Sequence, residues 1–423
     1  MRMDATAAAV PRERPRLVDF VRREWLLLSS LAVWLFFIAN FEAFRLVSGD
    51  ESVQYHFVQR LYGDRHDAVG YYFGLGLVEA PFYGIGKLLD HAGLHTVSGN
   101  PVEQAAAALG LGLLTIAAWP LVGAVIRGLR LPAAGFAILA AAFGTPFFYY
   151  AVFLPGKNHA VDGVLFAGAI YLVFRYLRTD GRERWVPFAL GALFGLSYTV
   201  RYFDGAAAVM LVLALLAWRR WRHAAQVAVT SAVVCLVLFA IPLAYGIPVF
   251  SGGNYSAENV LVFAPLNPLR MLFTDHRGYF VWSPVALLAT IGFVLLFRSR
   301  PEHRRFLAAV AAMSLGIMWA YSLVAFWDGT WTVGQRFFTP LFPVVAIGLA
   351  GLIDAAPRIA VAAAAVATAW FLFLAFNLMV IGGPQYVSNT PGGASDVALL
   401  PSRTHTSVGA YFWGIRFRSH LFR

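Results

Sequence analysis

Long apolar runs separated by short polar segments dominate the chain. A helix of about 20 apolar residues spans the roughly 30 Å hydrocarbon core of a bilayer, so runs of this length predict membrane-spanning helices. The pattern predicts eleven spans, with one stretch counted twice, at 25–44, 105–126, 131–153, 161–177, 186–218, 227–249, 281–297, 306–326, 338–353 and 359–381. The predicted fold class is therefore an all-α polytopic membrane protein.

The stretch 186–218 is the one counted twice. As a single helix it would be about 50 Å long, which exceeds the bilayer core. Arg201 and Asp204 interrupt its apolar pattern, and arginine clusters flank both of its ends. We therefore predict two short helices that meet near the outer face.

The stretch 71–89 is ambiguous, because it is apolar but contains Glu79, Lys87 and several glycines. If it crossed the membrane, every later arginine cluster would move to the outer face. We therefore predict that 56–89 forms interfacial helices on the outer leaflet. This choice places the N-terminus and the arginine clusters inside and the C-terminus outside, as the positive-inside rule favours.

Composition supports a membrane protein. The chain has 423 residues, is 59% hydrophobic and only 13% charged, which excludes an ordinary soluble globule. The formal net charge is +11, but most basic residues are arginines in short clusters between apolar runs, a pattern typical of topology signals rather than of a nucleic-acid-binding face. Cys235 is the single cysteine, so no intramolecular disulfide can form.

The predicted organisation is one membrane domain over 1–423. It comprises a cytosolic N-terminal segment at 1–24, an outer loop at 48–104 and an outer tail at 382–423 that is too short to build its own core. The basic segment 12–23 leads into a run long enough to span the bilayer, so we predict no cleavable signal peptide.

Polar residues collect at the predicted outer helix ends, which indicates one cavity at that interface. They are Asp50 and Glu51; Lys157, Asn158 and His159; Arg201 and Asp204; Asp275, His276 and Arg277; and Trp327, Asp328, Gln335 and Arg336. The sequence has no zinc-protease, CxxC, P-loop or dinucleotide-binding motif, so those chemistries have no positive support.

At these residues the chain resembles the GT-C superfamily of polyprenyl-phosphate-sugar-dependent glycosyltransferases, especially its protein O-mannosyltransferase and aminoarabinose-transferase branch. The resemblance rests on the acid pair after the first apolar run, on the interfacial helices of the first outer loop and on four strings, LPGKNHAVDG, TVRYFDG, FTDHRGYFVWSPV and FWDGTWTVGQRFFTPLFP. It covers about residues 20–355. The chain departs from the larger members in having no soluble C-terminal domain, which leaves the acceptor type open.

The resemblance implies that Asp50 is the catalytic base, with Glu51 beside it to contact the acceptor or a metal. A divalent cation, Mg²⁺ or Mn²⁺, would be held by one of these two acids if the reaction uses one. The alternative interpretation is that two acids at a helix end are simply solvated.

Cations are needed to stabilise the phosphate that leaves. We predict Arg201 and Arg336 as the main phosphate ligands, because arginine binds oxyanions bidentately, with Lys157, His159 and Arg277 as further candidates. Structural alternatives exist for three of them: Arg201 could pair with Asp204, Arg336 could pair with Asp328, and His159 could be a helix-cap or interface residue.

Other residues of the predicted cavity are candidates for substrate contact. Trp282, Trp327 and Trp331 could stack on a sugar ring, although tryptophan is expected at membrane interfaces without any ligand. His276 and Arg277 could equally bind lipid headgroups. The remaining candidate substrate contacts are Asp204, Asp328 and Gln335.

The predicted function is an inverting transfer of a mannose-class or arabinofuranose-class sugar. The donor would be a polyprenyl phosphate, and the acceptor a hydroxyl of a cell-envelope glycan, glycolipid or protein on the outer face of a bacterial plasma membrane. The competing hypothesis is a transporter or flippase of lipid-linked sugars. Transport would require ionisable residues along the mid-membrane path, whereas the mid-helix positions here are nearly all apolar. A non-catalytic scaffold would leave the outer acids and arginines without a shared cavity.

Overall fold

Helices make up nearly all of the chain that the computed structural model describes, namely residues 25, 28–29, 31–35, 50–66, 72–96, 101–249, 267–274, 278–324 and 334–380. They are α2 (Asp50–Leu61), α3 (Phe73–His91), α4 (Val102–Leu114), η2 (Thr115–Ala117), α5 (Ala118–Gly128), α6 (Ala134–Phe143), α7 (Pro146–Val152), α8 (Asn158–Arg178), α9 (Val186–Val200), η3 (Tyr202–Asp204), α10 (Gly205–Ala217), α11 (Trp221–Ala244), α13 (Asn267–Phe273), α14 (Tyr279–Trp282), α15 (Pro284–Ser299), η4 (Pro301–His303), α16 (Arg304–Ser322), η5 (Arg336–Leu341), α17 (Phe342–Ala355) and α18 (Pro357–Val380).

Six helical segments in the described ranges are long and apolar enough to cross a bilayer, or seven if the bent pair α6 and α7 is one span. The apolar helices α9, η3 with α10, and α15 are shorter. The chain is thus a multi-pass, all-α membrane protein, as the apolar pattern predicted. The number of spans, eleven, and the orientation of the termini remain predictions.

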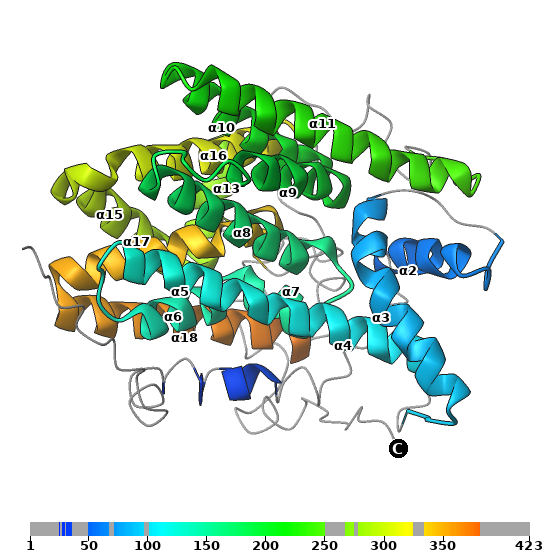
Figure 1. The fold of residues 1–423 in the computed structure, drawn as a ribbon. Helices are drawn as coiled ribbons and strands as arrows, with labels where there is room; N and C mark the ends of the chain where they lie inside the picture. The colour runs from blue at the N-terminus through cyan, green and yellow to red at the C-terminus, as the bar shows by residue number, and fades with distance from the viewer. Residues whose placement is uncertain are drawn as a thin grey trace, which may run out of the picture.

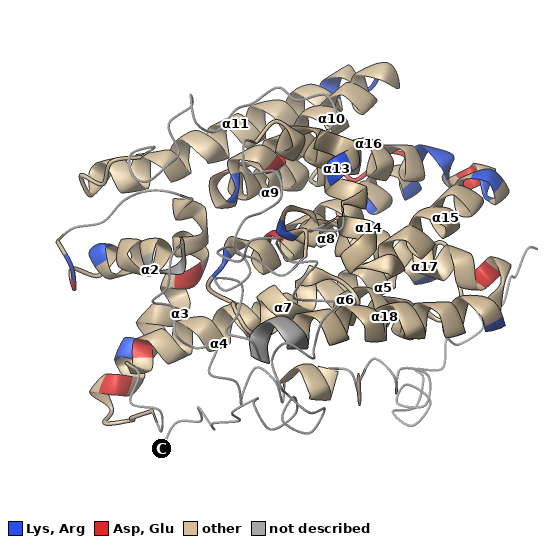
Figure 2. Cartoon of the chain, turned by 180° about the vertical axis from the view of Figure 1, so that it is seen from behind, with Lys and Arg blue, Asp and Glu red and all other residues tan. Residues whose placement is uncertain are grey.

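The long helices run roughly parallel to one another, and α3 lies across their direction at one end (Figure 1). Charged residues concentrate towards the helix ends, and Figure 2 shows a dense basic group where α15 meets α16. The helix α3 is not among those that meet the length and hydropathy requirements for a span. That it lies on the outer leaflet stays a prediction.

The predicted break within 186–218 is confirmed. The helix α9 ends at Val200, Arg201 has extended backbone angles, and α10 begins at Gly205. The predicted crossing at 131–153 differs from a straight helix, because α6 and α7 meet at an angle of 75°. The cause is Pro146, which disfavours helical angles at the preceding Thr145 and leaves that residue extended.

The first apolar run is anchored by Trp34, which is fully buried. Its indole Nε1 donates a hydrogen bond to Thr115 Oγ1 at 3.1 Å. Its ring packs edge-on against Trp119, with centroids 5.3 Å apart, and parallel to Phe147 at 5.7 Å. These contacts tie the N-terminal segment to η2, α5 and α7.

A polar contact holds α3 to the end of α2. Asp64 accepts hydrogen bonds from the Tyr83 hydroxyl at 2.7 Å and from Lys87 Nζ at 2.5 Å. Burial acts to raise the pKa of the Asp64 carboxyl, but the bonds from Lys87 and Tyr83 outweigh it and hold this pKa below its usual value. Burial also raises the pKa of the Tyr83 phenol, which stays protonated. The contact fixes the helix that begins at Asp50 relative to α3.

Glycines allow α15 and α17 to pack backbone to backbone. A Cβ atom on Gly292 would overlap the carbonyl oxygen of Gly348, and one on Gly348 would overlap that of Ala289. Small residues at helix contacts let helices approach closely within membranes, where packing rather than water exclusion drives association. The α15–α17 pair is therefore sensitive to the addition of a single methyl group.

We expect Gly292→Ala to lower the free energy of unfolding by about 1–3 kcal/mol, because the new methyl group must push the two helices apart. The matched control is Gly168→Ala in α8, where a Cβ would meet only Leu193 side-chain carbons at 3.4 Å and 3.6 Å. Alanine favours a helix over glycine, so the control should be neutral or stabilising. Thermal unfolding in detergent measures both, and equal behaviour of the two variants would contradict this account of the packing.

Candidate active site

Several of the predicted cationic residues gather at the end of the bundle where α8 begins, α9 gives way to α10, α16 ends and η5 begins. Arg201, His159 and Arg336 are at most 6% exposed. His159 lies within Coulombic range of Arg201, Arg336 and Lys157. Residues separated by up to 179 positions in sequence are thus brought into one buried cluster.

Arg201 is paired with Asp162 of α8, through a 3.0 Å contact between Nη1 and Oδ2. Both side chains are almost completely buried. The second carboxylate oxygen of Asp162 faces the Ser197 hydroxyl at 3.4 Å. Burying a charge costs several kcal/mol unless it is paired, so each member of this pair depends on the other.

Aromatic rings complete the surroundings of Arg201. Its guanidinium carbon lies 4.6 Å from the ring centroid of Tyr321 and 5.7 Å from that of Phe337. The two rings stack on each other, with centroids 4.6 Å apart and planes 9° apart. A guanidinium over an aromatic face is attracted by the ring quadrupole, most strongly when desolvated. Arg201 thereby links α8, α9, α16 and η5.

Arg336 lies on the other side of this arrangement, with its guanidinium 5.2 Å from the Phe337 ring. It is the first residue of η5, and its backbone carbonyl accepts a hydrogen bond from Thr339 Oγ1 at 2.7 Å. The preceding Gln335 is fully buried. The predicted residues Gln335 and Arg336 therefore reach the cluster together.

His159 lies between two aromatic rings, 4.6 Å from Tyr150 and 6.5 Å from Phe337. Its Nδ1 atom has no hydrogen-bond partner in the part of the chain that the structure describes. The carboxyl group of Asp204, only 2% exposed, lies against that of Asp162. Buried polar groups are normally hydrogen-bonded, so the His159 nitrogen is a group that a ligand could satisfy.

Asp204 is not the ionic partner of Arg201. It lies within electrostatic range of Arg201, but the ion pair at 3.0 Å joins Arg201 to Asp162 instead. Asp162 belongs to the LPGKNHAVDG string but was not among the predicted site residues. The sequence did contain a signal for Asp162. Asp162 lies three positions after His159, so both side chains are on the same face of a helix, and an acid within an apolar run usually has a partner or a function.

No role was predicted for Asn158. Its Nδ2 donates to the carbonyl oxygen of Val200 at 3.1 Å, which satisfies a carbonyl at the end of α9. Lys157, directly before α8, is partly exposed. Trp282, one of three candidates for stacking on a sugar ring, is 1% exposed in the structure.

The remaining predicted residues lie wholly or partly outside the described part of the chain. Asp50 and Glu51 are the first two residues of α2, a position where acids favour the helix dipole, but their side chains are not described. Asp275, His276, Arg277, Trp327, Asp328 and Trp331 are outside the described residues altogether.

Among the described residues, no group of three or more His, Cys, Asp or Glu side chains could hold a metal ion. The side chains of Asp50 and Glu51, one of which would hold a metal if the reaction uses one, lie outside the described part of the structure.

Comparison with known proteins gives a likeness in structure. No protein-family model matches the sequence, and no curated protein matches it. The apo crystal structure of ArnT from Cupriavidus metallidurans has a similar fold, with a TM-score of 0.56 and 14% identity over 87% of this chain. The structure of the same protein bound to undecaprenyl phosphate is similar over 89% of this chain, with a TM-score of 0.53 and 14% identity.

The chain spans about two thirds of ArnT, 65% and 69% of the two structures. At this level of identity the comparison shows the fold. ArnT is an aminoarabinose transferase, so the predicted resemblance to the aminoarabinose-transferase branch of the GT-C superfamily is confirmed for the fold. The chain is a multi-pass membrane protein whose fold is similar to that of ArnT.

We expect Arg201→Met to lower the free energy of unfolding by about 3–5 kcal/mol, because it leaves Asp162 buried without its counter-charge. Adding Asp162→Asn should recover part of that loss. The double variant should therefore lose less free energy of unfolding than the sum of the losses of the two single variants. The control is Asp354→Asn, which removes a half-exposed ion pair with Arg300 and should cost at most about 1 kcal/mol. Additive losses measured by unfolding in detergent would show that the buried pair is not coupled.

Proposed function

We propose that this protein is an inverting glycosyltransferase that takes a sugar from a polyprenyl-phosphate donor and attaches it to a hydroxyl of the cell envelope. The observation that carries this proposal is the cluster of Arg201, Arg336, His159 and Lys157 in a GT-C fold whose similar structure, ArnT, has been determined with undecaprenyl phosphate. By the predicted topology, the cluster faces the exterior of a bacterial plasma membrane.

The chemistry explains the need for buried cations. A polyprenyl-phosphate sugar is a phosphodiester with one negative charge, and it leaves as a monoester that gains a second. Cations that are already in place stabilise this developing charge more than they stabilise the bound donor, which is what lowers the barrier. In a site shielded from water the effect is larger than at an exposed surface.

The two arginines have different surroundings and, we infer, different roles. The charge of Arg201 is already balanced by Asp162, and its guanidinium is enclosed by Tyr321 and Phe337. Arg201 is therefore a positioning residue that maintains the shape of the cluster. We assign the phosphate contact to Arg336, with Lys157 and His159 as its neighbours.

The acceptor side of the reaction requires a base. We propose that Asp50 accepts the proton of the acceptor hydroxyl. The hydroxyl oxygen then forms the new bond to the anomeric carbon, while the bond between that carbon and the donor phosphate oxygen breaks. Attack from the face opposite the leaving phosphate inverts the anomeric configuration. Glu51 would orient the acceptor or hold a divalent cation, and the buried Asp204, which lies beside Asp162, would accept a hydrogen bond from a sugar hydroxyl.

An apolar groove next to the cluster suits the polyprenyl chain. It has a volume of about 640 Å³ and is formed by α9, α10, α11 and α16. Tyr202 and Phe203, which directly follow Arg201, lie in its wall, and the exposed Val209, Leu213 and Trp319 continue it along the bundle. A chain lying there would hold its phosphate close to Arg201 and Arg336.

The sugar and acceptor are proposed from the sequence resemblance. We propose a mannose-class or arabinofuranose-class sugar, with a glycan, glycolipid or protein of the envelope as acceptor. His276, Arg277, Trp327 and Asp328 would contribute to this part of the site from segments outside the described residues.

The role of Asp50 is tested by Asp50→Asn in purified protein, with a radiolabelled polyprenyl-phosphate sugar as donor and envelope extract as acceptor. Loss of the base should lower transfer by about 10²–10⁴-fold. The matched control is Asp90→Asn, which removes an exposed acid of the same predicted outer loop and should leave transfer unchanged. Full transfer by a folded Asp50→Asn protein would overturn the assignment, and transport of intact donor across vesicles without transfer would favour a flippase.

The role of Arg336 is tested by Arg336→Gln and Arg336→Lys. We expect Arg336→Gln to raise the donor KM and lower kcat by about 10²-fold, since it removes one charged donor from the leaving phosphate. Arg336→Lys keeps the charge without the bidentate geometry and should recover only part of the rate. The exposed Arg222 at the start of α11 provides the control Arg222→Gln, which should behave as wild type. Unchanged kcat and KM in Arg336→Gln would exclude the phosphate contact.

A further inference from the structure

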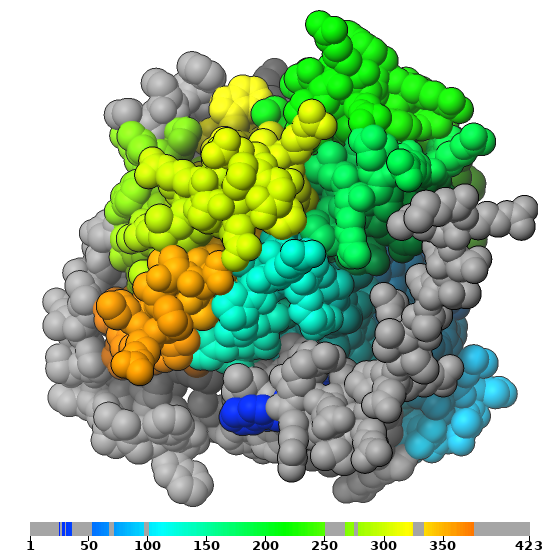
Figure 3. Space-filling model, turned by 60° about the vertical axis from the view of Figure 1, so that its left-hand side comes forward, coloured from blue at the N-terminus to red at the C-terminus, as the bar shows by residue number. Residues whose placement is uncertain are grey.

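A second basic site lies at the opposite end of the same helices. Seven arginines and two acids line one cavity of about 950 Å³. They lie in or next to the connections that follow α5, α8, α10 and α15, so four separate connections meet at the cavity. In Figure 3, which brings this end forward, the segments around these connections meet on one face. The helix α8 has 21 residues, so the cavity is about 30 Å from the His159 cluster.

Four of the cavity's polar residues are already held by neighbouring groups. Arg220 forms an ion pair with Asp180. Arg300 pairs with Asp354 of α17, at 2.8 Å. Arg304 donates hydrogen bonds to two carbonyl oxygens near the end of α15, at 3.2 Å and 3.4 Å. These interactions fix the loops that form the walls.

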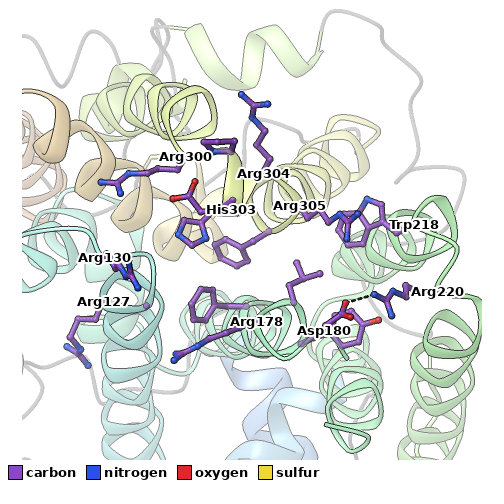
Figure 4. Close-up of a pocket in the computed structure, with 17 residues that line it drawn as sticks. Arg127, Arg130, Arg178, Asp180, Trp218, Arg220, Arg300, His303, Arg304 and Arg305 are labelled. Atoms are coloured by element: carbon purple, nitrogen blue, oxygen red, sulfur yellow. Dashed lines mark hydrogen bonds and ion pairs between the residues drawn. The ribbon is translucent and has the colours of Figure 1, made fainter. Parts of the chain in front are cut away.

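Three other arginines are not neutralised in this way. Arg130, Arg178 and Arg305 form no ion pair with any residue that the structure describes, although each lines the cavity. In Figure 4 the side chains of Arg130, Arg178 and His303 border the same open space, while Arg304 points away from it. The cavity therefore combines three unneutralised guanidinium groups with a titratable imidazole.

The backbone adds to the positive potential. Arg304 and Arg305 occupy the first turn of α16, a 19-residue helix whose dipole attracts anions at this end. Cations at this position are electrostatically unfavourable unless an anion lies nearby. Arg130 also has a positive φ of 59°, a conformation in which glycine would be less strained.

The positive-inside rule alone would account for arginines in these loops. It does not require them to surround one cavity, since topology signals work equally well when they point into water or towards headgroups. Here Phe174, Phe306 and Trp218 supply apolar wall between the charged groups. Such walls weaken solvent screening and strengthen the attraction of the cavity for an anion.

We propose that this cavity is a binding site for a phosphate-bearing anion, held by Arg130, Arg178 and Arg305. The group recognised is a phosphate monoester or a pyrophosphate, because three guanidinium groups match two or more negative charges and bind phosphate oxygens bidentately. The phosphate is carried by a membrane lipid headgroup or by a soluble molecule. The site is separate from the cluster assigned to glycosyl transfer and does not depend on that assignment.

The test uses the full-length protein and two probes. Inorganic pyrophosphate is titrated into detergent-solubilised protein by calorimetry. Phosphatidic acid, a lipid phosphate monoester, is compared with phosphatidylglycerol, a phosphodiester, in nanodiscs analysed by native mass spectrometry. Binding of pyrophosphate at one site indicates a soluble ligand, and selective retention of phosphatidic acid indicates a lipid headgroup.

The variants are Arg130→Gly, Arg178→Gln and Arg305→Gln. We expect each to weaken binding of the active probe by about tenfold, as the loss of one charged hydrogen-bond donor predicts. Arg130→Gly relieves a left-handed arginine, so it should fold at least as well as wild type while still losing affinity. The control is Arg358→Gln, which removes an exposed arginine at the start of α18, outside the cavity, and should change affinity less than twofold.

The proposal is overturned if wild-type protein binds neither probe at a single site. It is also overturned if Arg358→Gln weakens binding as much as the cavity variants do, because that would show attraction by overall charge rather than a built site. Glycosyl transfer measured in parallel should be retained by the three cavity variants, which keeps this test distinct from that of the transferase site.

Discussion

The buried ion pair between Arg201 and Asp162 is the interaction on which the candidate active site depends. A charge in a membrane-embedded bundle cannot rely on water, so its partner must be within the protein. Asp162 supplies the counter-charge from α8, and Tyr321 and Phe337 enclose the guanidinium from α16 and η5. Four elements therefore have to meet at Arg201. The break between α9 and α10, which costs backbone hydrogen bonds, lies at Arg201 itself, where the guanidinium group reaches Asp162.

The two ends of the bundle use arginine in different ways. At the end with His159, the described arginines Arg201 and Arg336 are buried next to aromatic rings, so an approaching phosphate would meet groups that are already desolvated and fixed in place. At the other end, arginines are numerous and line an open cavity. This arrangement attracts an anion from a distance and allows the side chains to adjust to it. The first arrangement suits a reaction in which charge develops, and the second suits retention of a charged ligand.

Close helix packing connects the two ends. Because glycines bring α15 and α17 into backbone contact, η5 at the start of α17 and η4 at the end of α15 are held at opposite ends of one rigid pair. Arg336 stands at the first of these positions and Arg300 at the second. Rigid helices place such side chains more accurately than loops do, which an electrostatic site requires.

The sequence by itself determined the class of fold and the break within 186–218. Apolar runs of bilayer length can satisfy their backbone groups only as helices, so composition and periodicity were sufficient for the all-α architecture and for the break at Arg201. Which polar groups meet was decided by tertiary structure. From the sequence, Asp204, three positions away, was the alternative partner of Arg201, yet Arg201 pairs with Asp162, which is 39 positions away. The arrangement of Arg130, Arg178 and Arg305 around one cavity was equally hidden, because it depends on how helices pack side by side, and local sequence does not specify which helices become neighbours.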